Sequence, residues 1–97
     1  TGDAIDAATA ERIGLVNHVV AHERLLEEAK AMARKILEKG PRAIALAKAA
    51  IHQALETSLS AGLSFETEAF GLAGATQDKV EGMRAFLEKR KPAFKGE

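Results

Sequence analysis

The residues best placed to contact a ligand are three consecutive cations near the end of the chain, Lys89, Arg90 and Lys91. They follow a segment whose apolar residues recur at helical spacing, so we expect them at the end of a last helix, which Pro92 would stop. Cations are favourable at the negative end of a helix dipole, and the same run could attract an anion such as a phosphate. No aromatic residue is interleaved with it, and nucleic-acid binding is therefore not expected.

Other residue types give no catalytic set. His18, His22 and His52 do not stand at ligand spacing with carboxylates, so we expect no metal site. The chain has no cysteine, no serine in a Gly-x-Ser-x-Gly turn and no phosphate-binding fingerprint. Glu66 and Glu68 are two residues apart on an expected helix, where they would not face each other. We therefore assign no catalytic residue.

The composition is that of a small globular domain or a piece of one. The chain has 97 residues, of which 46% are hydrophobic, and its 14 basic and 14 acidic side chains cancel. A net charge of zero argues against a long-range pull on nucleic acid or an anionic membrane. No apolar run approaches the roughly 20 residues that a membrane span needs. The start at Thr1-Gly2-Asp3, without Met or a signal peptide, predicts a fragment of a longer protein.

Apolar residues at helical spacing predict an all-α chain of four to five helices with almost no sheet. The expected helices are a short one that Asp6 caps and Gly14 closes, then Leu25–Leu37, Pro41–Leu59, Leu63–Ala73 and a last one that begins after Thr76. The Val-rich segment Leu15–Val20 is expected to be extended, either as an edge strand or as a buried link.

The two phenylalanines of the Leu63–Ala73 segment cannot share one helix face. Phe70 comes five residues after Phe65, which separates the two rings by roughly 140° at about 100° per residue. Either the helix is sandwiched between two neighbours, or one ring awaits a partner. Such an exposed apolar face favours a contact with another subunit or domain.

Two stretches together resemble the crotonase (enoyl-CoA hydratase/isomerase) superfamily. The first, residues 1–20, is similar to the family pattern TG-x-x-I-x-A-x-x-A-x-x-x-GLV-x-x-V. The second, within residues 70–94, is similar to D-x-x-EG-x-x-AF-x-EKR-x-P-x-F. Their order and spacing also fit, so the resemblance covers essentially the whole chain.

The resemblance implies the C-terminal helical (trimerisation) region of a crotonase-fold α/β protein. Residues 1–20 would end the core as a turn, a short helix and an extended link, and residues 21–97 would form a C-terminal helical domain. In this family the core binds acyl-CoA, two backbone N–H groups form an oxyanion hole, and two glutamates act as acid and base in the hydratases. These parts lie upstream of Thr1, so none is assigned to residues of this chain.

By motif position, Phe70 and Lys89 match a Phe and a Lys that family hydratases place beside the coenzyme A bound to a neighbouring subunit. The intact protein would then hydrate a trans-2-enoyl-CoA thioester, with coenzyme A entering as substrate and no separate cofactor. It would form a trimer or hexamer in the cytoplasm, or alternatively in the mitochondrial matrix, with no nucleic-acid or membrane partner. This fragment alone would be inactive. The alternatives are a free-standing, non-catalytic helical oligomerisation module, or another reaction of the superfamily such as isomerisation or hydrolysis.

Overall fold

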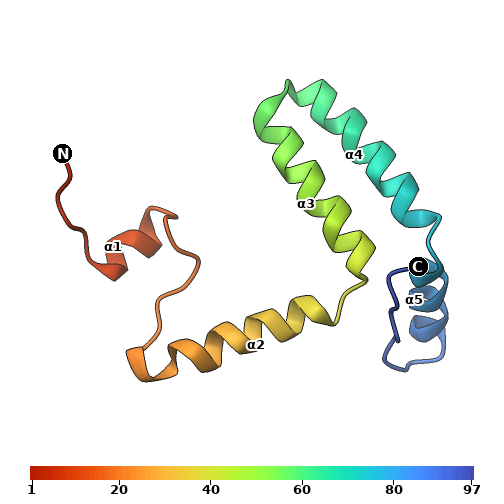
Figure 1. Ribbon diagram of the computed structural model, residues 1–97, viewed down its shortest axis with the longest axis horizontal. Helices are drawn as coiled ribbons and strands as arrows, with labels where there is room; N and C mark the ends of the chain where they lie inside the picture. Colours follow the sequence, from red (N-terminus) through yellow and green to blue (C-terminus); the bar gives the residue numbers. More distant parts are fainter. The chain divides into compact units, whose positions relative to one another are not determined.

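The computed structural model describes all of residues 1–97, and its regular secondary structure is helical throughout (Figure 1). Its elements are α1 (Ala7–Arg12), a short 3-10 turn (His22–Arg24), α2 (Leu25–Leu37), α3 (Pro41–Glu56), α4 (Leu59–Gly74) and α5 (Gln77–Leu87). No residue is in a strand. The predicted all-α chain of four to five helices is confirmed.

The chain divides into two compact units, residues 1–33 and 34–97, and the division falls inside α2. The first unit has the predicted short helix, whose N-cap Asp6 accepts a hydrogen bond from the N–H of Thr9 at 2.7 Å. Gly14 closes this helix with φ of 77°, a left-handed conformation that glycine adopts without a steric cost. The predicted boundary after residue 20 stays a prediction.

The segment after α1 departs from the expectation. Leu15–Val20 forms neither a strand nor a buried link, and five of its six residues are exposed. A strand needs a partner to pair its N–H and C=O groups, and this chain offers none. The N–H of Val19 instead donates to the carboxylate of Glu11 at 3.1 Å.

In the second unit, α3 and α4 lie side by side as an antiparallel hairpin (Figure 1). The break between them is sharp, because Ser58 caps α4 by accepting a hydrogen bond from the N–H of Ala61. The fourth helix therefore begins at Leu59 and not at Leu63 as expected.

Small residues form the contact between α3 and α4. A β-carbon built on Gly62 would lie 3.6 Å from the Cα of Ala54, so the backbones approach closely. Ala69 is buried and Ala50 is half-buried. Larger apolar side chains nearby stay exposed, with Leu55 at 80%. Glycine and alanine permit the closest helix approach, and the large apolar side chains remain outside it.

The last helix begins as predicted and ends earlier than predicted. Thr76 caps α5 by accepting a hydrogen bond from the N–H of Lys79 at 3.1 Å. The helix stops at Leu87, before the basic run, because Lys89 turns the chain with φ of 54°. The run therefore follows the helix, and Pro92 does not stop it.

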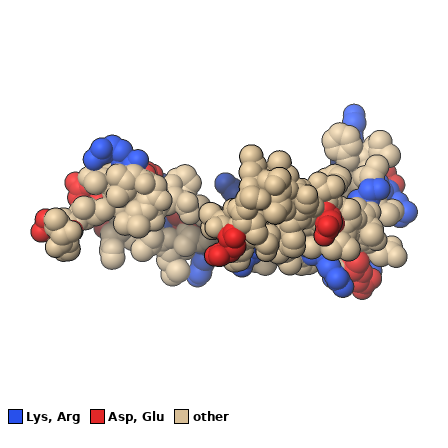
Figure 2. Space-filling view, turned by 90° about the horizontal axis from the view of Figure 1, so that it is seen from above, with Lys and Arg blue, Asp and Glu red and all other residues tan.

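Charged side chains are scattered over the face of the molecule seen in Figure 2. Figure 2 shows small groups of basic and acidic residues separated by uncharged ones, in keeping with the zero net charge. No helix in the structure combines the length and the apolar character needed to cross a membrane.

Candidate functional site

The turn after α5 places Lys89 in an unusual backbone conformation. The N–H of Arg90 reaches back to the carbonyl of Ala85 at 3.0 Å, and the N–H of Lys89 to that of Phe86 at 3.2 Å. This is the Schellman arrangement, whose left-handed position is usually glycine. Lys89 is the only residue other than glycine with positive φ in the chain. A side chain at this position adds backbone strain, and strained residues of this kind cluster at ligand contacts.

The basic run is not a uniform patch, because its middle residue is neutralised. The guanidinium of Arg90 donates two bonds to the carboxylate of Glu81, at 2.6 and 2.9 Å, and one to Glu88 at 2.6 Å. Lys89 and Lys91 on either side form no ion pair within the chain. The cations free to meet an outside anion are therefore these two lysines.

The same pairing changes the protonation of both partners. The hydrogen bonds from Arg90, followed by the N–H of Ala93, lower the pKa of Glu81 to about 2. In return, the hydrogen bonds to Glu81 and Glu88 raise the pKa of Arg90 above its ordinary value. The pair is ionised at every physiological pH.

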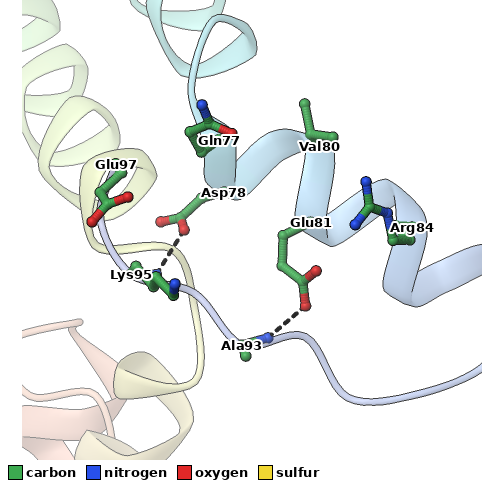
Figure 3. A pocket seen from close by; sticks show the side chains of 8 residues that line it. All are labelled: Gln77, Asp78, Val80, Glu81, Arg84, Ala93, Lys95 and Glu97. Carbon is green, nitrogen blue, oxygen red and sulfur yellow. Dashed lines mark hydrogen bonds between the residues drawn. The ribbon is translucent and has the colours of Figure 1, made fainter.

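The tail beyond Pro92 folds back along α5 and borders a hollow of about 330 Å³ (Figure 3). Asp78, at 7% exposure, accepts the N–H groups of Lys95 and Gly96 at 2.7 and 2.8 Å. These bonds were not predicted from the sequence. Figure 3 shows Asp78 and Glu81 on consecutive turns of α5, both directed at the tail.

Of the two phenylalanines of α4, which were predicted not to share a face, Phe70 is the exposed one. Its side chain is 80% exposed, whereas Phe65 is half-buried. Phe70 borders an apolar groove of about 430 Å³. Among the other residues lining the groove are Gly40, Ala43, Ala73, Met83 and Phe94. Lys89 is not one of the lining residues, so the structure does not join the two predicted contact residues in one groove.

The structure groups no residues into a metal site. No three His, Asp or Glu side chains come together in a group that could hold a metal ion. His18 lies near only one carboxylate, that of Glu11 at 3.9 Å, and both side chains are largely exposed.

Comparison with known proteins gives one consistent relationship. The enoyl-CoA hydratase/isomerase family matches residues 1–97. The chain is 53% identical over 94 residues to crotonyl-CoA hydratase of Syntrophomonas wolfei. This match covers 97% of this chain and 36% of that protein. It is 43% identical over 96 residues to 2,3-dehydroadipyl-CoA hydratase of Escherichia coli, covering 99% of this chain and 38% of that protein.

Solved structures agree with the sequence relatives. An enoyl-CoA hydratase crystal structure from Bacillus anthracis matches with a TM-score of 0.91 and 43% identity, covering 94% of this chain and 35% of that one. An enoyl-CoA hydratase/isomerase structure from Mycobacterium paratuberculosis matches with a TM-score of 0.94 and 30% identity. The match covers 99% of this chain and 38% of that one. The chain thus spans little more than a third of the length of these proteins.

Proposed function

Because the chain belongs to the enoyl-CoA hydratase/isomerase family, we propose that it is the helical, subunit-contacting part of an enzyme that hydrates trans-2-enoyl-CoA thioesters. The names of the S. wolfei and E. coli relatives, both hydratases of CoA thioesters, support the reaction. Coenzyme A enters as part of the substrate, and no separate cofactor is proposed. The catalytic groups belong to the part of such a protein that this chain does not contain.

Within that enzyme the second unit contacts neighbouring copies, in a trimer or a hexamer. The large apolar side chains of the α3–α4 hairpin support this, because most of them remain exposed. Ile51 on α3 is 62% exposed, and Leu55 and Leu59 are more exposed still. Exposed apolar side chains concentrated in this way mark a protein contact.

Lys89 and Phe70 make contact with coenzyme A bound to a neighbouring subunit. The observation that carries this proposal is the backbone of Lys89: a position suited to glycine holds a lysine whose ammonium has no partner within the chain. An ammonium group suits a CoA phosphate, and the exposed ring of Phe70 suits the pantetheine or acyl portion.

No nucleic acid or membrane is proposed as a partner. We place the enzyme in the cytoplasm, with the mitochondrial matrix as the alternative suggested by a mitochondrial relative from Arabidopsis thaliana.

The decisive experiment compares two neighbouring lysines in the intact protein that carries this chain. Lys89→Ala should raise KM for crotonyl-CoA a few-fold at low ionic strength and leave kcat nearly unchanged, because an exposed phosphate contact is weak and remote from the chemistry. Lys91→Ala, which removes a neighbouring cation, should leave both constants unchanged. Equal effects of the two variants, or no effect of Lys89→Ala, would reject the contact. Phe70→Ala should weaken both substrate binding and subunit association.

The isolated 97-residue chain should not hydrate crotonyl-CoA, since it would lack the catalytic groups. Protein-dependent hydration by the purified chain would overturn this view. If the intact protein instead isomerises or hydrolyses acyl-CoA, product analysis by mass spectrometry would reveal it.

A second candidate is a free-standing oligomerisation module, which the exposed apolar side chains also favour. The mass of the protein in its source separates the two, since the module requires a product of about 10.3 kDa.

A further inference from the structure

One carboxylate on α5 holds the chain at two points after the turn that carries Lys89. Glu81 receives two parallel bonds from the guanidinium of Arg90, immediately after Lys89. The same carboxylate accepts the N–H of Ala93, beyond the turn, at 2.9 Å. The side chains of Glu81 and Arg90 are only 22% and 39% exposed. Paired bonds between a guanidinium and a carboxylate fix direction as well as distance.

A second anchor holds the end of the tail. Both carboxylate oxygens of Asp78 accept backbone N–H groups of the tail, and the N–H of Asp78 donates to the carbonyl of Glu97 at 3.2 Å. The side chain of Arg42 on α3 adds a bond to the carbonyl of Gly96 at 3.1 Å. Figure 3 shows the Asp78 and Glu81 contacts as successive ties between helix and tail.

The turn between helix and tail needs such support. A lysine resists the left-handed conformation because its β-carbon crowds the following carbonyl, so surrounding contacts must maintain φ at 54°. We propose that Glu81 and Arg90 are positioning residues, which hold Lys89 in this turn and thereby direct its ammonium group toward an anionic ligand. The proposal rests on the proposed role of Lys89.

Hydrogen exchange tests the structural half of the proposal without any substrate. In the intact protein, Glu81→Gln removes the charge and one acceptor oxygen, and backbone amides of residues 90–97 should exchange at least about tenfold faster. Glu88→Gln is the matched control, since Glu88 holds the same guanidinium by one bond and does not bond the tail. It should have a smaller effect. Unchanged exchange in Glu81→Gln would overturn the proposal, as would equal acceleration in both variants.

Kinetics test the functional half. Glu81→Gln should raise KM for crotonyl-CoA by as much as Lys89→Ala, again with kcat nearly unchanged. In the Lys89→Ala background it should raise KM no further, because the group that it positions is gone. A further rise there would show that Glu81 acts by another route and reject the positioning role. If Lys89→Ala alone has no effect on KM, the ligand contact fails, and the exchange experiment still decides whether Glu81 holds the turn.

Discussion

In the α3–α4 hairpin two helices approach through glycine and alanine, whereas the C-terminal tail is tied to α5 by carboxylates that accept backbone N–H groups. The hairpin leaves its large apolar side chains exposed, Leu55 and Phe70 among them. In the tail, the N–H groups of Ala93, Lys95 and Gly96 donate to carboxylates of α5, and one of these, Asp78, is buried. The difference supports the proposal that another surface completes the hairpin, whereas the tail is restrained by contacts within the chain.

The stability of the hairpin should depend most on Gly62, where α3 and α4 approach most closely. Gly62→Leu would force a branched side chain against the backbone of Ala54, which lies 3.6 Å from a β-carbon at this site. We expect a loss of about 1–3 kcal/mol in the free energy of unfolding, typical of overpacking. Gly62→Ala is the control, since a methyl group at 3.6 Å makes ordinary contact. Urea unfolding of the intact protein measures both, and equal stability of the two variants would mean that the helices do not meet through Gly62.

A side chain at Gly96 should loosen the packing of the tail. This glycine has φ of 81°, and a β-carbon there would lie 3.1 Å from Cγ of Pro41. Gly96→Ala should cost about 1 kcal/mol or more and should accelerate amide exchange only in the tail. Gly74→Ala, at a site with open space and no positive φ, is the matched control. If the tail amides of Gly96→Ala exchange as slowly as those of the unaltered protein, the close contact between Gly96 and Pro41 is contradicted.

Substitutions of Lys89 should affect the stability of the protein and its binding of ligand differently. Lys89→Gly relieves the left-handed strain and should stabilise the protein by about 1 kcal/mol, whereas Lys89→Ala keeps the strain. Both variants should raise KM alike, because both lack the ammonium group. Thermal unfolding combined with kinetics measures the two effects, and a Lys89→Gly variant no more stable than Lys89→Ala would show that the turn is unstrained.

The smallest expected effect is on pH dependence. The pKa of Glu81 is lowered from 4.5 to about 2, chiefly by Arg90, with Ala93 N–H and Arg84 in support. A lowered pKa contributes stability that is present above 4.5 and lost as the pH falls toward 2. The stability difference between the unaltered protein and Glu81→Gln should therefore shrink below pH 4.5. A difference that stays constant down to about pH 3 would exclude the pair as its source.

Local signals in the sequence were sufficient for much of the fold. The N-caps Asp6 and Thr76 and the closing Gly14 act within a few residues, so their helix ends could be predicted. The spacing of Phe65 and Phe70 predicted that the two rings do not share a face, and the structure shows that Phe70 is the exposed one.

What the sequence did not reveal depends on contacts between distant residues. The Glu81–Arg90 pair spans nine residues and exists only because the chain reverses at Lys89, where no glycine signals a turn. The contact between α3 and α4 depends on how closely the two helices approach at Gly62 and Ala54, which the spacing within either helix does not give. Similarly, Asp78 looks like an ordinary first-turn acid until the tail folds back onto it.

A crystal structure of the intact protein with a bound acyl-CoA would test the central claim most directly. We predict that the Lys89 ammonium lies within about 4 Å of a phosphate of coenzyme A held by a neighbouring subunit, with the Phe70 ring beside the same ligand. A fully occupied complex in which Lys89 points into solvent, or in which its CoA contact comes from its own subunit, would contradict the account.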